Sequence, residues 1–412
     1  MFTVAYHIAR NTFRECLRHP IYIIMLLSAL CIIGWYPWLS LFVFRQQEKL
    51  VTDGSLATIL LFGLITAVLC ASHAIYREIE TGTILLVLSK PVNRGVFIIA
   101  KMLGIIGALT IFVWITSIGT LFAVRIGADQ FELDLIVIAL HFGGMVLACC
   151  LGGYLNYYRR AAFAAVSTKA LFVIFSVLVI VVYFLPAYEH NMKWGVIVGY
   201  NWNLVRAAIL VMFAVWAMAA LATALSTKLN MVTNLTVCLV IFILGLSSQY
   251  SYDQVIDMKS TDTIMLMHYW FYLLAPCLLA FWILALKHFD ARENHQLRRW
   301  HFHTAFGTCM IALLVLIYTN EINDEALSNT ALWMKIVGGM IHEVKDIVAL
   351  TIHAFVPNWQ LFWMADALAA KSTIPSSYVV FGAGYVAILI FFFFLGGLLM
   401  FTSREVGLQS QQ

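Results

Sequence analysis

Five charged side chains are gathered in one short polar stretch that separates two long apolar runs. Arg77, Glu78 and Glu80 open the stretch and Lys90 and Arg94 close it, in a chain of which only 11% is charged. The chemistry open to such side chains is ion pairing with a partner in water. The stretch therefore predicts a loop that docks a soluble protein.

The order of residues within this stretch predicts a rigid structure. Glu78 and Glu80 precede Gly82, which is typical of a short helix closed by glycine. Pro91 then stiffens the return, because the residue before a proline avoids the helical region. Charges in a loop can also serve only to fix its orientation, but glutamates contribute little to orientation. The two glutamates therefore favour docking.

Two other groups of polar residues suggest different chemistry. His295, His301 and His303 form a cluster without acidic or cysteine companions, whereas zinc usually has four ligands. A basic rim that touches anionic lipid is the favoured interpretation of this cluster. The region 320–377 contains His342, Glu343, Asp346 and Asp366, among others, but no recognised metalloprotease spacing. These residues indicate either an enzymatic site or the solvated polar face of interfacial helices.

The composition requires a membrane as solvent. Of the 412 residues 62% are hydrophobic, and the mean hydropathy is +0.89. Soluble domains are about 45–50% apolar and about 25% charged. Runs of about 20 apolar residues cross a hydrocarbon core of roughly 30 Å. Such runs lie at 21–44, 56–75, 96–124, 133–153, 162–186, 204–226, 231–249, 267–286, 304–319 and 378–402.

We therefore predict an all-α integral membrane protein, a polytopic helical bundle of about ten spans. An even number of spans places both termini on one side. Most of the 25 Lys and Arg residues fall in the cytoplasm when the N-terminus does, so we expect both termini to be cytoplasmic. The net charge of +4 is explained by this orientation, and no nucleic-acid partner is expected.

Two segments outside the predicted spans are amphipathic, residues 1–20 and the loop 320–377. In residues 1–20, Arg10, Arg14 and Arg18 share one face, as in a helix that lies along anionic headgroups. The loop 320–377 is too polar for an ordinary span and predicts a pair of re-entrant or interfacial helices on the outer face. Trp359 and Trp363, four residues apart, are typical of an aromatic anchor at the headgroups.

Several segments, taken in order, resemble the permease subunits of ATP-binding cassette (ABC) transporters of the type 2 (ABC-2) family. The family order E-x-G-T, L-S-x-P-V-x-R and F-x-x-x-K-x-x-G is matched without gaps between Arg77 and Gly104. Three further segments follow in the family order, at 224–230, at 356–362 with 374–375, and at 401–405. The family usually has six spans, so the runs at 133–186 and 267–319 look like two added hairpins.

The resemblance implies a domain organisation and a set of site residues. Residues 1–20 correspond to the elbow helix and 21–412 to the transmembrane permease domain, with a coupling loop at 76–95 and an outer loop at 320–377. Contacts with the ATPase are expected at Arg77, Glu78, Glu80, Thr81, Gly82, Thr83 and Arg94. An outer gate is expected at Pro357, Trp359 and Trp363.

The family architecture also implies partners. A separate cytoplasmic ABC ATPase would bind ATP and Mg, and a second permease copy, identical or not, would lie beside this one in the cell (inner or plasma) membrane. No G-x-x-x-x-G-K-[ST] run occurs in the chain, so it cannot hold nucleotide phosphates by that route. As a transport subunit, this chain is expected to have no bound cofactor and no catalytic residue. The expected function is the transport subunit of an ATP-driven exporter. The alternatives are a membrane-embedded enzyme that acts on a lipid-linked substrate and an ATP-independent carrier.

Overall fold

The computed structural model describes residues 2–43, 47–82, 94–127, 133–185, 201–256, 357–370 and 372–402. Every regular element in these ranges is a helix, so the predicted all-α class is confirmed. Two compact units are distinguished, Met1–Ile243 with Trp359–Gln412, and Leu244–Asn358. Helix α10 (Met231–Ile256) begins in the first unit and ends in the second. All the packing described below lies within the first unit.

Among the described residues, seven helices are long and apolar enough to cross a membrane. They are α2 (Pro20–Ser40), a continuous helix Gln47–Glu80, α6 (Arg94–Ile126), α7 (Leu135–Arg159), α8 (Phe163–Phe184), α9 (Trp202–Leu225) and α15 (Ser376–Thr402). The predicted run at 231–249 is found as the shorter apolar stretch Met231–Leu246. The predicted runs at 267–286 and 304–319 lie outside the described residues. The chain is thus a polytopic helical membrane protein.

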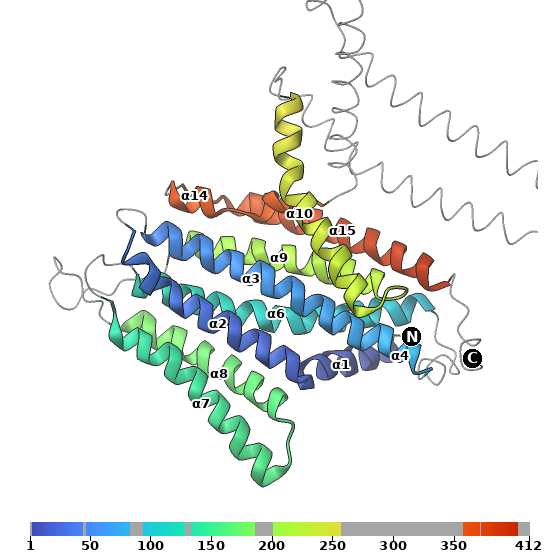
Figure 1. Ribbon diagram of the computed structural model, residues 1–412, viewed down its shortest axis with the longest axis horizontal. Helices are drawn as coiled ribbons and strands as arrows, with labels where there is room; N and C mark the ends of the chain where they lie inside the picture. The colour runs from blue at the N-terminus through green and yellow to red at the C-terminus, as the bar shows by residue number, and fades with distance from the viewer. Residues whose placement is uncertain are drawn as a thin grey trace, which may run out of the picture. The chain divides into compact units, whose positions relative to one another are not determined.

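The core of the first unit lies between the second span, α6 and α9 (Figure 1). The apolar windows of these helices are 67%, 67% and 72% buried, against 28% for α8. Small side chains allow this close packing, and α9 buries Ala217, Ala219, Ala220, Ala222 and Ala224. Because α6 contacts α1, α2, α3, α7, α8, α9 and α15, a displacement of α6 reaches most of this unit.

The second span changes its helical geometry near its end. It consists of α3 (Gln47–Ala71), a π-helical turn η1 (Ser72–Tyr76) and α4 (Arg77–Glu80). The N–H of Thr81 binds the carbonyl of Arg77 at 2.9 Å, and Gly82 follows with φ of 70°. The predicted short helix closed by glycine is therefore present, as the last turn of the second span and not as a separate helix.

The spans run back and forth, so their connections gather at two ends (Figure 1). One end, which we call the α4 end, holds α1 (Phe2–Arg18), α4, the first turn of α6 and the last turn of α15. Here the ring of Phe401 lies 5.9 Å from the guanidinium of Arg94. The other, the α14 end, holds the 3₁₀ turn η2 (Trp359–Phe362) and α14 (Ala365–Ala369).

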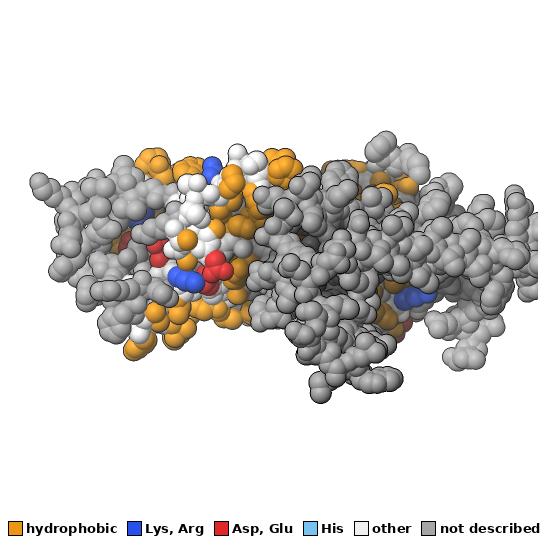
Figure 2. All heavy atoms as spheres, turned by 90° about the horizontal axis from the view of Figure 1, so that it is seen from above, with side chains coloured by type: hydrophobic (Ala, Val, Ile, Leu, Met, Phe, Trp, Pro, Cys, Tyr) orange, Lys and Arg blue, Asp and Glu red, His pale blue; other side chains and the backbone are white. Residues whose placement is uncertain are grey.

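Helices α7 and α8 form a hairpin that packs closely on itself. A Cβ added at Gly152 of α7 would lie 1.9 Å from Oγ of Ser167 in α8, so the two helices are in direct contact at this glycine. Their outer faces expose Val146, Val177 and Ile180. Hydrophobic side chains also cover much of the described surface that is visible in Figure 2, with charged side chains in few places. Such a surface fits lipid and not water.

Candidate coupling site

The last turn of the second span has an outward and an inward face. Arg77, Glu80 and Thr81 are exposed, whereas Ile79 is buried. Glu78 is turned inward and contacts α6. The outward face presents a base, an acid and a hydroxyl to a partner, while the inward face joins α4 to the bundle. Of the two predicted glutamates, Glu80 therefore faces outward and Glu78 faces the bundle.

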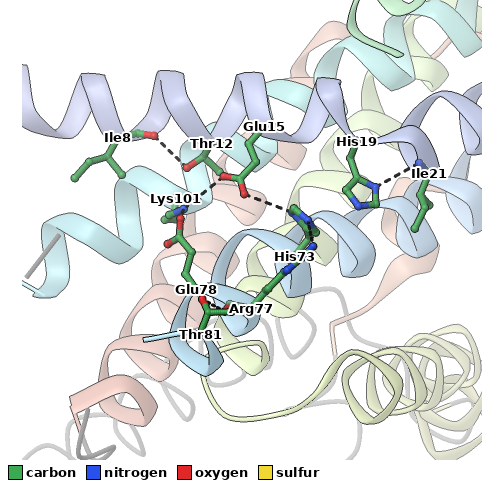
Figure 3. A network of polar contacts seen from close by, with 10 residues as sticks. All are labelled: Ile8, Thr12, Glu15, His19, Ile21, His73, Arg77, Glu78, Thr81 and Lys101. Carbon is green, nitrogen blue, oxygen red and sulfur yellow. Dashed lines mark hydrogen bonds and ion pairs between the residues drawn. The ribbon is translucent and has the colours of Figure 1, made fainter. Parts of the chain in front are cut away.

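A buried lysine of α6 holds the inward glutamate (Figure 3). Nζ of Lys101 donates to Oε1 of Glu78 at 2.7 Å and lies 3.9 Å from Oε2 of Glu15. The Lys101 side chain is only 3% exposed, and the two carboxylates are 23% and 28% exposed. Because a buried charge is costly unless it is paired, Lys101 ties α1, α4 and α6 together at one point.

Glu15 extends this network to the π-helical turn. Its Oε1 lies 3.4 Å from Nδ1 of His73, and Nε2 of His73 lies 3.0 Å from the guanidinium of Arg77. Arginine can only donate, so a neutral His73 accepts at Nε2 and donates from Nδ1 to Glu15. The contacts run from α1 through η1 to α4 (Figure 3).

The ionisation of Glu15 follows from these contacts. Burial alone would raise the pKa of Glu15, but the hydrogen bond with His73 and the charge of Lys101 outweigh it, so the pKa is lowered from its ordinary value of 4.5. A carboxylate with a lowered folded pKa stabilises the fold fully above its ordinary pKa. The stabilisation is lost as the pH falls through the folded value, so acid weakens the network.

His19 fixes the junction of α1 and α2 to the same turn. Its ring centroid lies 4.3 Å from that of His73. Burial first, and then the neighbouring His73 and Arg77, lower the pKa of His19, which favours a neutral ring. Nδ1 of this ring accepts the backbone N–H of Ile21 at 3.3 Å and so caps α2.

Three residues of the F-x-x-x-K-x-x-G run have separate roles on α6. The ring of Phe97 stacks on Phe401, 6.0 Å between centroids, and lies 5.7 Å from Nζ of Lys101. Gly104 allows α1 to pack directly on α6, because a Cβ there would lie 2.6 Å from the carbonyl oxygen of Ala9. The run therefore specifies the surface on which both α1 and the end of α15 pack.

Gly82 ends α4 in a backbone conformation that other residues adopt at a cost of about 1–2 kcal/mol. An added Cβ would meet no atom within 4 Å, so Gly82→Ala changes the backbone preference alone. We expect faster hydrogen exchange of the amides at 77–82 and an almost unchanged melting temperature. Gly82→Asn should have the smaller effect, because asparagine tolerates this conformation better. Equal exchange in the wild type and Gly82→Ala would show that the turn does not depend on glycine.

Two predicted coupling residues, Arg94 and Thr83, remain to be placed, and two residues of the site were not predicted. Arg94 is exposed in the first turn of α6, and Thr83 lies outside the described residues. Glu15 and His73 are functional residues that the sequence pattern did not predict. Glu15 had a signal, because it is the single acidic side chain in the otherwise basic segment 1–20. His73 had none, because its position depends on the π-helical turn.

Two of the three predicted gate residues, Trp359 and Trp363, lie at the α14 end, in different surroundings. Trp359 is 1% exposed, and its ring centroid lies 6.3 Å from that of Phe242, so it is a core residue. Trp363 is half-buried against the same core. Pro357 belongs to the second unit. The part of the outer loop at 320–356, where the re-entrant helices were mostly predicted, lies outside the described residues.

Of the polar residues named for the alternative sites, only Asp366 lies among the described residues. The described residues contain no group of three or more His, Cys, Asp or Glu that could hold a metal ion. Asp366 forms an ion pair with Lys49 at 3.3 Å, both on the surface. The histidine cluster at 295–303 and the polar residues at 342–346 lie outside the described residues.

The fold and the site together define a class of protein, a polytopic helical membrane protein whose N-terminal helix is joined by buried ion pairs to the end of its second span. A model of the ABC-2 family transporter protein matches residues 6–194. This confirms the predicted family, and the segment is a membrane domain of the ABC-2 transporter family. It includes all the residues of the Lys101 network. No curated protein and no solved structure gave a significant match to the chain.

Proposed function

We propose that the chain is the permease subunit of an ATP-driven ABC transporter that works as an exporter. A separate cytoplasmic ABC ATPase binds ATP and Mg and docks on the outward face of α4. A second permease copy, identical or not, completes the translocation unit in the cell membrane. The observation that carries this proposal is the division of α4 into an exposed face and a face that is bound to α6 and α1 through Lys101.

The distribution of charges supports a cytoplasmic α4 end. The cytoplasmic side of a membrane protein carries an excess of Lys and Arg. At the α4 end, the described basic residues are Arg10, Arg14, Arg18, Arg77, Arg94, Lys101, Arg159, Arg160, Lys169 and Lys228, and the acidic ones are Glu15, Glu78 and Glu80. At the α14 end, the basic residues are Lys49, Arg125 and Arg206, and the acidic ones are Glu48, Asp53, Asp134 and Asp366. With this orientation α1 and the last turn of α15 face the cytoplasm.

Force applied to α4 would reach the bundle by two connections. One is the continuous backbone of the helix Gln47–Glu80. The other is the pair of contacts from Lys101 to Glu78 and Glu15, which join α4 to α6 and to α1. A displacement of α4 would therefore tilt the second and third spans together. Such a tilt would change access to a path between the two permease copies.

Charge reversal at Glu80 tests the docking surface. Glu80 is exposed, so Glu80→Lys leaves the packing of α4 unchanged but places a like charge against any basic surface of the partner, which is unfavourable at an interface. We expect at least about a tenfold loss of binding to the cassette ATPase and of the ATPase rate that the complex supports. Both are measured by co-purification and by phosphate release.

Glu48→Lys is the matched control for this experiment. It makes the same charge change on an exposed residue of the second span at the α14 end, where no ATPase would reach it. Its binding and ATPase rate should equal those of the wild type. If Glu80→Lys also equals the wild type, the docking proposal is wrong.

A further inference from the structure

A groove that is open to the surface lies between α1, α6 and α8. Counting its open side, it holds about 1300 Å³ of empty space. Its lining includes four basic and two large apolar side chains, namely Arg10, Arg14, Arg18, Lys169, Phe13 and Leu103. No acidic residue lines it. The groove therefore combines a positive rim with an apolar wall.

The four bases of this groove lack partners within the described part of the chain. All four are exposed, and none of them forms an ion pair or hydrogen bond with a described residue. In contrast, two half-buried arginines at the α14 end are bound. Arg125 donates to the carbonyl of Leu185 at 2.7 Å, and Arg206 donates to that of Ile374 at 2.7 Å. The charges of the groove are thus available to an anion from outside the described residues.

The positions of the lining residues along their helices decide what kind of anion fits. Lys169 lies six residues after the start of α8 at Phe163, or about 9 Å along the helix axis. Leu103 lies nine residues after the start of α6 at Arg94, or about 14 Å along its axis. Leu103 is 54% exposed, so an apolar group can cover it. The groove therefore extends from the depth of the headgroups into the hydrocarbon, where a small soluble anion would leave the apolar wall uncovered.

We propose that this groove binds an anionic phospholipid from the surrounding leaflet. Its phosphate lies among Arg10, Arg14 and Lys169, and an acyl chain lies along Leu103 and Phe13. Basic pockets between membrane helices suit such headgroups, and the long stems of Arg and Lys reach the interface readily. The lipid would anchor α1 to the leaflet beside α6. This inference does not depend on the docking of an ATPase.

Native mass spectrometry of the full chain tests the proposal with defined lipids. Protein is titrated with phosphatidylglycerol and with phosphatidylcholine, and the bound lipids are counted. We expect a clear preference for phosphatidylglycerol. The combined change Arg10→Gln, Arg14→Gln and Lys169→Gln should weaken this binding on the order of 100-fold, because each charge contributes about fivefold. The control Arg159→Gln with Lys228→Gln, two exposed bases outside the groove, should keep wild-type affinity.

A second variant separates a lipid from a soluble anion. Leu103→Ser keeps every charge but removes part of the apolar wall, so it should weaken binding of phosphatidylglycerol. Glycerol phosphate, the soluble probe, should not displace the lipid at comparable concentration. The proposal is overturned if the two lipids bind equally, if the triple variant retains wild-type binding, or if glycerol phosphate competes as well as the lipid does.

Discussion

Lys101→Met is expected to destabilise the protein by about 3 kcal/mol and to uncouple it from the ATPase proposed above. Removal of one partner from a buried ion pair leaves the other charge uncompensated, which costs about 3–5 kcal/mol. The lower end of that range applies because Glu15 and Glu78 keep 28% and 23% of their side chains exposed. The melting temperature, followed by intrinsic fluorescence in detergent, should fall by several degrees.

Lys49→Met provides the matched control, because it removes the same charge from an ion pair on the surface. Lys49 and Asp366 are 40% and 82% exposed, and exposed pairs contribute about 0–1 kcal/mol. A neutral triple variant, Lys101→Met with Glu15→Gln and Glu78→Gln, separates the two effects. It should regain part of the melting temperature but not the ATPase rate. Equal melting temperatures for Lys101→Met and Lys49→Met would contradict the role of the buried lysine.

Gly104→Ala is expected to push α1 away from α6. The new Cβ would lie 2.6 Å from the carbonyl oxygen of Ala9 and 2.8 Å from Cβ of Thr12, and neither atom belongs to the flexible end of a side chain. Such overpacking costs about 1–3 kcal/mol, and more where the backbone must shift. Cys16 of α1 is 3% exposed, so it should resist maleimide in the wild type and react in the variant.

Gly143→Ala is the control for this change. It is also a glycine within a membrane-spanning helix, but its added Cβ would meet no atom within 4 Å. It should keep Cys16 protected and should stabilise its helix slightly, since alanine is the better helix former by about 1 kcal/mol. Labelling at Cys16 is located by peptide mass spectrometry. If Gly104→Ala leaves Cys16 as unreactive as Gly143→Ala does, the direct packing of α1 on α6 is refuted.

The spans and the family were predictable because both depend on local features of the sequence. Apolar runs of spanning length locate helices to within a few residues. For example, the third run is predicted from residue 96, and α6 begins at Arg94. The order of motifs between 77 and 104 located the end of the second span and the start of the third. These signals need no knowledge of tertiary packing.

The direction of individual side chains was not predictable in the same way. Glu78 and Glu80 look equivalent in the sequence, but only Glu78 meets Lys101, because that contact depends on where α1 and α6 lie. Trp359 and Trp363 have the spacing of an aromatic anchor, yet Trp359 is a core residue. Long-range packing, which the local pattern does not contain, decides both cases.

The phase of α4 about its own axis is set by a single inserted residue. A π-helical turn, here Ser72–Tyr76, contains one residue more than an α-helical turn. If the same residues were wound as an unbroken α-helix, each residue after this turn would lie about 100° further round the helix axis. Glu78 would leave Lys101, and a different side would point outward. An insertion in a hydrophobic span thus selects which side chains this protein offers at its surface.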